Sequence, residues 1–597
     1  MPQFPLVGAT YQDESLASDA QMTLNMYPQR NTSGSGQGSA ASALYQTPGC
    51  YLLCTAGAAG ACIVPADTYV FPDGVTPAFF CINGDQLQYI TIALGVGVFT
   101  GALVTIGTVA QKPLSGSSLF PAQIIVISPQ LLFVVANGQA FVAAYGAAIA
   151  SNGLDQGGAS YAAGDTGIID GAQGIDATYV INTVDGSGAV LTYTLTYAGI
   201  GYSVATSVGT LAFGMQPGIG TGFTIDIGGT IAPAWVVQQQ AIPVTDTGFG
   251  NWINSATFMD GYVIVSMAPQ SADPLRRQFF VSGLNDPSFW DPLEVGEKEG
   301  NPDPIIAVFA AYEMLALWGS QTMELWYDSG NLQFQFSRIA GGGVIENGLA
   351  STWCVCKADG TVIWLGTDIR GDNVAWQLQG MTPVRISNHA IENTWRNYDM
   401  NGSSCYSYQE NGHFFCVFNF PVPDATWVYD STTHMWHQRG STDGGGVLHS
   451  SYGRYHAFAQ GVGHVLQDYN NGNIYVSNQG FTNEDGAAIT RIRRTPHIRK
   501  ELARGVLDRV RLLIDAGGSS AGLGGGSISL RVSYDGGNTW GPYYTQSMGA
   551  TGDFTQLIQW YHLGYARDFV LEISSNSEVF QSWVEGYGEY RLAKNYD

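Results

Sequence analysis

Residues that could do chemistry are spread thinly along this chain, and their spacing fits no nucleophile, zinc or phosphate-binding motif. The eight cysteines include one close pair, Cys354 and Cys356, which an alternating strand places on the same face. Zinc-type Cys-x-x-Cys pairs are absent, so we interpret the cysteines as buried thiols, with a disulfide or a metal site as alternatives. The closest histidines, His413, His434 and His437, are interpreted as packing or surface residues. We assign no catalytic residue, no metal ligand and no cofactor.

The most specific local motif is a turn rather than a reactive site. Ser533, Asp535, Gly537, Thr539 and Trp540 fit the pattern S-x-D-x-G-x-T-W, the Asp-box hairpin. The Asp carboxylate accepts backbone N–H groups, the glycine permits a tight turn, and the tryptophan packs beneath it. Sialidase-type propellers carry several copies beside an arginine triad and a tyrosine nucleophile. A single copy outside the predicted blades indicates a structural turn.

A basic stretch at residues 491–512 holds eight of the 24 Lys and Arg residues. Dense arginine can bind DNA phosphates, form forked bonds with acidic protein surfaces, or make an ordinary solvated face. In so acidic a chain we favour contact with protein. The residues assigned to this contact cluster are Arg491, Arg493, Arg494, Arg499, Lys500 and Arg504.

The overall charge is strongly negative and unevenly distributed. The 597 residues carry a net charge of −24, and only two basic residues, Arg30 and Lys112, precede position 276. Because phosphate affinity comes mainly from Lys and Arg, the chain as a whole is a poor nucleic-acid binder. The N-terminus has neither the basic nor the apolar region of a secretory signal, so we predict none.

The elements that must position these residues are short strands. Gly makes up 77 residues and aromatics 12%, while only 12% of residues are charged, which favours strands and tight turns over long helices. Alternating apolar runs flank Asn137-Gly138, Asp260-Gly261, Asp359-Gly360 and Asn411-Gly412, the strongest short hairpin signals. Between residues 250 and 480 a three- or four-strand unit recurs about every 40–50 residues, the length of a propeller blade. A chain of β-sandwiches is the alternative.

Two segments depart from this pattern. Residues 90–111 are uncharged and long enough to cross a membrane, but their glycine, threonine and β-branched content predicts two strands joined near Thr100-Gly101. Residues 151–230 contain no Lys or Arg and are rich in Gly and Thr, which indicates a small inserted β domain. Its Asp and Gly residues suggest calcium as a minor alternative, although the spacing matches neither the EF-hand nor the nonapeptide repeat.

The predicted fold is therefore all-β, with a propeller core, an inserted small β domain and a C-terminal β-sandwich-like domain. Its predicted segments are residues 1–60 as an N-terminal assembly arm, 61–150 and 231–485 as a propeller of about six blades, 151–230 as the insertion, and 486–597 as a C-terminal platform.

The chain resembles the packaged-DNA stabilization, or tail hub (nozzle), family of short-tailed bacteriophages. The resemblance lies in turn and packing motifs and covers most of the chain except about residues 151–230. The motifs are Pro5–Tyr11 with Asn25–Pro28, Thr47–Cys50, Asp273–Trp290, Pro304–Tyr327, and Arg509–Leu513 followed by the Asp-box turn.

This resemblance implies a structural virion protein of the phage tail, assembled in the host cytoplasm, rather than an enzyme. Six identical copies would form a tube below the portal and adaptor proteins, in contact with tail fibre or needle proteins. The tube would retain packaged double-stranded DNA and guide its ejection without specific binding, and no membrane span is implied. A carbohydrate-active or carbohydrate-binding propeller, a glycosidase or lectin, is the alternative.

Overall fold

Almost every described element of the computed structural model is a β-strand, and the predicted all-β class is confirmed. Within the described ranges the single α-helix is α1 (His389–Trp395), which begins at Asn388, whose side chain accepts a bond from the Ile391 backbone. The structure describes residues 3–30, 42–66, 76–94, 99–109, 122–128, 131–146, 149–172, 175–200, 202–213, 220–230, 234–240, 253–267, 277–331, 334–340, 343–367, 373–443, 446–499, 503–516, 525–550 and 552–592.

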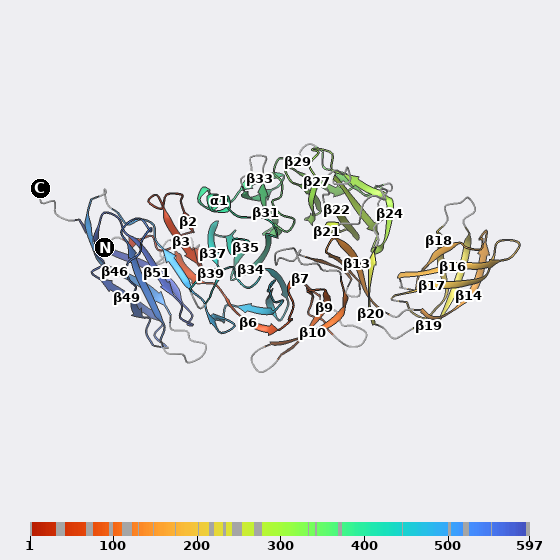
Figure 1. Cartoon of the computed structure of the whole chain (residues 1–597), viewed down its shortest axis with the longest axis horizontal. Coiled ribbons are helices and arrows are strands. Elements are labelled where there is room, and N and C mark those ends of the chain that lie inside the picture. The colour runs from red at the N-terminus through yellow and green to blue at the C-terminus, as the bar shows by residue number, and fades with distance from the viewer. Residues whose placement is uncertain are drawn as a thin grey trace, which may run out of the picture.

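Three bodies follow one another along the long axis: the C-terminal sandwich, the propeller and the insertion (Figure 1). The described part of the propeller contains seven runs of four antiparallel strands, where the sequence pattern predicts about six. From the innermost strand outward, blade 1 consists of β7 (Gly60–Pro65), β8 (Phe79–Asn83), β9 (Gln86–Leu94) and β10 (Phe99–Thr108), and blade 2 of β11 (Gln123–Ser128), β12 (Leu131–Ala136), β13 (Gln139–Gly146) and β20 (Ala234–Gln240). In the same order, blade 3 consists of β21 (Ile253–Met259), β22 (Tyr262–Met267), β23 (Gln278–Gly283) and β24 (Asp286–Glu297). Blade 4 consists of β25 (Ile305–Ala311), β26 (Met314–Gly319), β27 (Met323–Asp328) and β28 (Phe336–Arg338), with β29 (Val344–Ile345) beside β27.

Blade 7 accounts for the difference in blade number, because a strand from the N-terminal region completes it. Strand β6 pairs antiparallel with β42, so that Cys50 faces Ser477. Blade 5 consists of β30 (Val355–Ala358), β31 (Thr361–Thr367), β32 (Asn373–Gln379) and β33 (Thr382–Arg385). Blade 6 consists of β34 (Ser404–Glu410), β35 (His413–Phe420), β36 (Ala425–Asp430) and β37 (Met435–Arg439). Blade 7 consists of β40 (Tyr455–Ala459), β41 (Gly463–Gln467), β42 (Ile474–Asn478) and β6 (Gly49–Cys54). Short pairs β38 (Ser441–Thr442) with β39 (Leu448–His449) and β43 (Asn483–Glu484) with β44 (Ala487–Ala488) lie nearby.

The blades are held together by apolar clusters between neighbouring sheets. One cluster joins blades 1 and 7 through Leu53, Phe79 and Val465, and another joins blades 4, 5 and 6 around Trp318, Trp364 and other side chains. Blade 1 therefore packs directly on blade 7, which closes the ring around a central axis.

The Asn-Gly and Asp-Gly hairpin predictions are confirmed. At the turns Asn137-Gly138, Asp260-Gly261, Asp359-Gly360 and Asn411-Gly412, both residues have positive φ, between 46° and 89°. Two consecutive positive φ angles define the type I′ turn, whose twist matches that of the flanking strands. In the described part of residues 90–111, β9 and β10 pair antiparallel as predicted, but Thr100 and Gly101 do not form the turn, since they pair with Ala93 and Ile92 inside the ladder.

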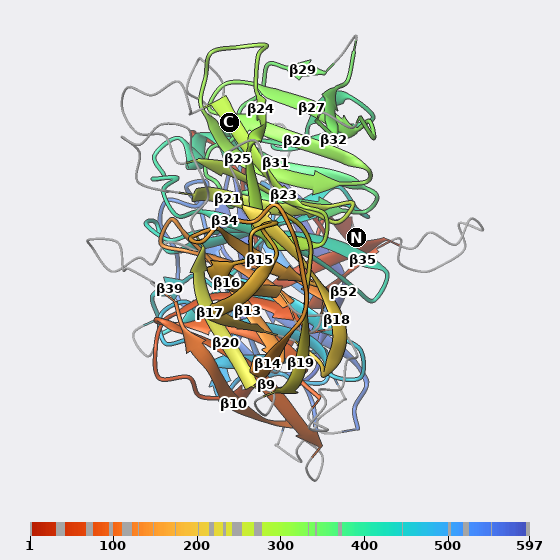
Figure 2. The same ribbon diagram turned by 90° about the vertical axis from the view of Figure 1, so that its right-hand side faces the viewer.

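The insertion leaves blade 2 between β13 and β20 and forms a six-stranded sheet with its own core around Tyr179 and Phe223. Figure 2 looks along the long axis from this end and shows these strands in front of the propeller. In sheet order the strands are β14 (Ile149–Ala159), β19 (Thr221–Thr230), β18 (Ala205–Phe213), β15 (Thr166–Asp170), β16 (Ile175–Val184) and β17 (Val190–Ile200).

The C-terminal sandwich has two sheets, and strands from the first 46 residues enter both. The basic stretch at residues 491–512 lies largely in the strands β45 and β46. Sheet one consists of β4 (Met26–Arg30), β5 (Ser42–Gln46), β52 (Ser582–Leu592), β46 (Gly505–Asp515) and β49 (Thr555–Tyr561), with β1 (Gln3–Phe4) and β50 (Tyr565–Ala566) alongside; sheet two consists of β3 (Ala20–Leu24), β45 (Arg491–Arg494), β51 (Val570–Ser575), β47 (Ser527–Ser533) and β48 (Tyr544–Ser547), with β2 (Tyr11–Gln12) beside β3.

Sheet two also continues into the propeller. Strand β3 pairs with β37 of blade 6 at Leu24 and Gln438, and the Asn25 side chain donates to the carbonyls of Gly440 and Thr490. Propeller and sandwich thus share main-chain hydrogen bonds.

Candidate functional site

The predicted protein-contact cluster is divided by the fold, because Arg491 and Arg493 are completely buried. Arg493 donates from Nε to the Leu6 carbonyl at 2.6 Å and from Nη2 to the side-chain oxygen of Gln21 at 2.7 Å. Its Nη1 donates to Ala9 O and Thr23 Oγ1. The prediction of a partner contact is therefore wrong for Arg491 and Arg493, since their donors face inward.

Burial alters both guanidinium groups without neutralising them. Desolvation lowers the pKa of Arg491 to about 10, partly offset by Glu484, and that of Arg493 to about 9. Arg491 donates to the carbonyls of Ile489, Thr482 and Ser577. A buried charge is tolerated only when its donors find acceptors, and here main-chain carbonyls supply them.

Arg494 is also engaged within the sandwich. Its Nε lies 2.7 Å from the buried carboxylate of Glu572, and Arg531 Nε lies 2.6 Å from the other oxygen of the same group. Both guanidinium groups lie over the ring of Trp540, at 5.2 Å and 4.8 Å from its centre. Of the remaining cluster members, Arg499 and Arg504 are exposed, and Lys500 lies outside the described residues.

The Asp-box prediction is confirmed as a turn between β47 and β48. The Asp535 carboxylate accepts bonds from the Thr539 backbone at 2.8 Å and hydroxyl at 2.6 Å, while Ser533 Oγ accepts one from the Gly537 backbone at 2.8 Å. The bonds from Thr539 lower the pKa of Asp535 to about 2. A Cβ on Gly537, where φ is +98°, would lie 3.8 Å from the Trp540 ring, so the tryptophan does pack against the turn.

A cavity of about 210 Å³ lies on the propeller axis. Every blade contributes to its wall from its innermost strand. One lining residue from each blade, in blade order, gives Cys62, Gln123, Ser255, Val308, Val355, Tyr406 and His456. Among the described residues that line it there is neither Asp nor Glu.

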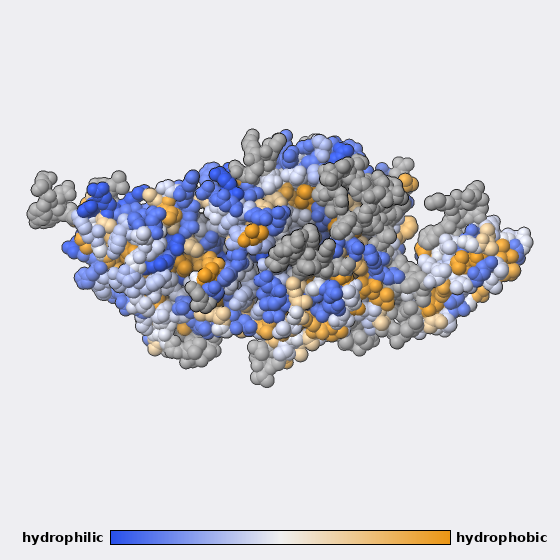
Figure 3. Space-filling model, viewed as in Figure 1, coloured by the Kyte–Doolittle hydropathy of each residue, from blue (hydrophilic) through white to orange (hydrophobic). Residues whose placement is uncertain are grey.

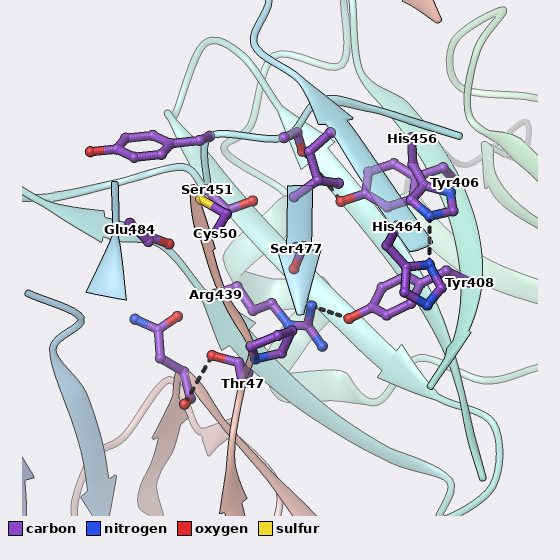
Figure 4. Close-up of a pocket in the computed structure, with 15 residues that line it drawn as sticks. Thr47, Cys50, Tyr406, Tyr408, Arg439, Ser451, His456, His464, Ser477 and Glu484 are labelled. Carbon is purple, nitrogen blue, oxygen red and sulfur yellow. Dashed lines mark hydrogen bonds between the residues drawn. The ribbon is translucent and has the colours of Figure 1, made fainter. Parts of the chain in front are cut away.

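A second cavity, of about 40 Å³, lies where blades 6 and 7 meet the N-terminal segment (Figure 4). Arg439 extends across it and donates to the Tyr408 hydroxyl, while its other terminal nitrogen has no protein partner. Glu484 lines the opposite side, and burial raises its pKa to about 7 despite the nearby charges of Arg491 and Arg439.

A wall of aromatic rings separates the two cavities. Tyr406 stacks on His456 with 5.3 Å between ring centres, and both residues line both cavities. His456 Nε2 lies 3.0 Å from His464 Nδ1. Desolvation lowers the pKa of His456 to about 3, so this pair is neutral at physiological pH. No sequence pattern indicates the two cavities or the aromatic wall between them, because their residues come from several distant segments.

The histidines singled out from the sequence lie in or beside blade 6, as packing or surface residues. His413 is buried with Nδ1 2.8 Å from Asp430, His437 is buried against Phe415, and His434 is exposed. Across the described ranges, no group of three or more His, Cys, Asp or Glu side chains is arranged to hold a metal ion. No helix in those ranges has the length and apolar character of a membrane span.

Comparison with known families identifies the propeller. Residues 236–480, which cover blades 3 to 7 apart from β6, match the family model Phage_stabilise, described as bacteriophage P22 Gp10, beta-propeller. The resemblance to the phage stabilization family is confirmed. The part of the sequence resemblance at residues 273–276 lies outside the described residues. No curated protein shows significant sequence similarity to this chain.

Solved structures with some similarity to this chain share little sequence with it. An exo-beta-1,3-galactanase from Phanerochaete chrysosporium is 10% identical over 73% of this chain and 100% of its own, with a TM-score of 0.23. Kluyveromyces lactis Hsv2 is 9% identical over 64% and 97%, with a TM-score of 0.23. A family 43 arabinoxylan arabinofuranohydrolase from Bacillus subtilis is 9% identical over 98% and 99%, with a TM-score of 0.17. At these TM-scores the likenesses carry no argument about function.

Proposed function

We propose that this protein is a structural subunit of a short phage tail, a nozzle or hub protein without enzymatic activity. Six copies form a tube below the portal and adaptor proteins, which retains packaged DNA and guides its ejection. Tail fibre or needle proteins are further partners, and the subunit assembles in the host cytoplasm before it joins the virion tail. The observation that carries this proposal is the family match over residues 236–480.

The propeller's own axis is too narrow to conduct DNA. Its cavity has a volume of about 210 Å³ and is walled by side chains from all seven blades, whereas a duplex needs a bore wider than its own major groove, which is about 12 Å across. Tyr406 and His456 also fill part of the axis with stacked rings. A DNA channel must therefore lie between copies of the chain, which favours a ring in which each propeller forms part of the wall.

Charge favours passage of DNA over binding. The chain carries a net charge of −24. Of its basic residues, Arg491 and Arg493 are buried. Arg494 shares the carboxylate of Glu572 with Arg531. Salt screens charge over about 8 Å under physiological conditions, so an acidic wall repels phosphate only at close range. Such a wall would keep DNA from adhering during ejection. The visible face of propeller and sandwich is largely hydrophilic with scattered apolar residues, which agrees with a subunit that stays soluble before assembly (Figure 3).

Mass measurement and negative-stain imaging of the purified chain test this proposal. We expect six-fold rings and a dissociation constant for duplex DNA weaker than the typical nonspecific range of about 10⁻⁴–10⁻⁶ M at physiological salt. A monomer that binds or cleaves glycans would instead support the carbohydrate-active alternative. A six-fold ring that binds duplex DNA tightly would keep the structural role and contradict the repelling wall.

A further inference from the structure

A group of four cysteines lies between blades 5 and 6, and neither the fold nor the proposed function accounts for it. Three of the four are buried in the apolar cluster that joins these blades, and the fourth packs against it. The group consists of Cys354, Cys356, Cys405 and Cys416. All are free thiols.

The backbone brings the innermost strands of the two blades together at this point. The Cys405 N–H donates to the Trp353 carbonyl at 2.9 Å, and Ser407 Oγ donates to the Lys357 carbonyl. Cys356 lies between these two links. The parallel bridge between Trp353 and Ser404 sets the register here, so Cys356 and Cys405 lie diagonally across the two strands, and the contact between them is made by their thiols.

The side chains share one face. In blade 6, Ser407 is paired with Cys416, so Cys405, Ser407 and Cys416 all point to the same side of the sheet. Cys356 accepts hydrogen bonds from the thiols of Cys405 and Cys416, which lower its pKa, while burial raises the pKa of Cys405. Cys356 is therefore the more acidic thiol, and the thiolate is the form that reacts with oxidants.

Access distinguishes the two possible partners of Cys356. Cys405 is partly exposed and lines the axial cavity of about 210 Å³, whereas Cys416 is completely buried on the second strand. A small oxidant that enters the cavity thus meets Cys405 and, immediately behind it, Cys356, whose exposed fraction is 6%.

We propose that Cys356 and Cys405 are an oxidation site, at which hydrogen peroxide forms a reversible disulfide between blades 5 and 6. The Cys356 thiolate attacks one peroxide oxygen, the O–O bond breaks, and the leaving hydroxide takes up a proton as water, which leaves a sulfenic acid. The Cys405 sulfur then displaces that hydroxyl, its thiol proton leaves with it as a second water, and the S–S bond forms. Two thiols and one peroxide give one disulfide and two waters.

The bond would cross-link neighbouring blades and stiffen the ring. Reducing agents of the cytoplasm keep the thiols free during assembly, and oxidation follows outside the cell. This consequence rests on the proposed function, whereas formation of the bond does not.

Peroxide treatment of the full-length protein tests the proposal. After reduction and removal of the reductant, we expect titratable thiols under denaturing conditions to fall from eight to six. Peptide mass mapping should show Cys356 linked to Cys405, and dithiothreitol should restore all eight thiols. We expect the thermal midpoint to rise by several °C upon oxidation, because the cross-link restricts the unfolded chain.

Matched variants localise the effect. Cys356→Ser should keep its seven remaining thiols after peroxide, because the attacking thiol is gone, whereas Cys405→Ser should lose one thiol, as a sulfenic acid at Cys356, and form no cross-link. The control Cys54→Ser, in strand β6 of blade 7, should still lose two. The wild-type peptide map decides the matter even if a variant fails to fold. Linkage of Cys356 to Cys416, peroxide treatment that leaves eight thiols, or over-oxidation of Cys405 without a cross-link would each overturn the proposal.

Discussion

Glu484 makes the stability of the propeller closure depend on pH. This residue belongs to β43, which pairs with the closing strand β6 at Cys50, and it lines the cavity beneath Arg439. Burial raises its pKa from 4.5 to about 7. The folded protein therefore holds this proton more tightly than the unfolded chain does.

The sign of the effect follows from linkage. Below pH 4.5 both states are protonated and the group costs nothing. Between pH 4.5 and 7 only the unfolded chain ionises, so stability falls as pH rises, and above pH 7 the loss is complete. A shift of 2.5 units corresponds to about 3 kcal/mol at 1.36 kcal/mol per unit, which partial exposure of the side chain reduces to about 2–3 kcal/mol.

Glu484→Gln removes the ionisable group at nearly constant shape. We expect the variant to unfold at the same temperature as wild type at pH 4.5 and about 2–6 °C higher at pH 8, given about 1–2 °C per kcal/mol for a domain of several hundred residues. Circular dichroism melts across this pH range provide the measurement. Glu346→Gln, which changes an exposed glutamate after β29, is the matched control and should follow wild type.

An equal gain at both pH values would show that packing rather than charge explains the effect. Absence of a gain at pH 8 would mean that Glu484 is not destabilising when ionised. Either result would refute the linkage between this carboxyl and the closure.

Three further outcomes are expected. Arg493→Met removes the donor for four internal acceptors and should lower the free energy of unfolding in urea by at least about 3 kcal/mol. The N-terminal strands should also be proteolysed faster. Arg499→Met, which changes an exposed arginine, should alter the free energy of unfolding by no more than about 0.5 kcal/mol. Asp535→Ala removes the acceptor of the Asp-box turn and should cost about 1–2 kcal/mol, measured as faster hydrogen exchange at β47 and β48. Leu53→Asp places a charge in the cluster between blades 1 and 7 and should expose β40–β42 to exchange, while Leu94→Asp, 75% exposed in wild type, should not.

Local patterns predicted local structure well. The hairpin at Asn137-Gly138 was predictable because two adjacent residues determine the turn and thereby the pairing of β12 with β13. Blade 7 was not, because its last strand comes from the opposite end of the chain and Ile474 pairs with Cys54. No local signal encodes a pairing across more than four hundred residues.

The basic stretch shows a different limit of sequence reasoning. In Arg491-Ile492-Arg493, alternation predicts a buried isoleucine between two exposed arginines. The structure has the opposite arrangement, with both arginines buried and Ile492 partly exposed. Leu6 in the N-terminal segment, Thr482 before β43 and Ile489 before β45 present carbonyl oxygens to these arginines. Hydrogen bonds to these oxygens compensate the cost of burial. A high density of arginine therefore indicated internal hydrogen bonding as well as surface charge.

Where the chain can move follows from how its three bodies are joined. The sandwich and blade 6 share the pairing of β3 with β37, reinforced by the Asn25 amide, so rotation between them would break buried hydrogen bonds. Each buried polar group that loses its partner raises the free energy by about 1–3 kcal/mol, so such a rotation is energetically unfavourable. The insertion has its own core, is connected to blade 2 where β13 ends and β20 begins, and also contacts β24 of blade 3 through β16. In the tube that we propose, movements that open or close it should thus occur between copies or at the insertion, with propeller and sandwich acting as one unit.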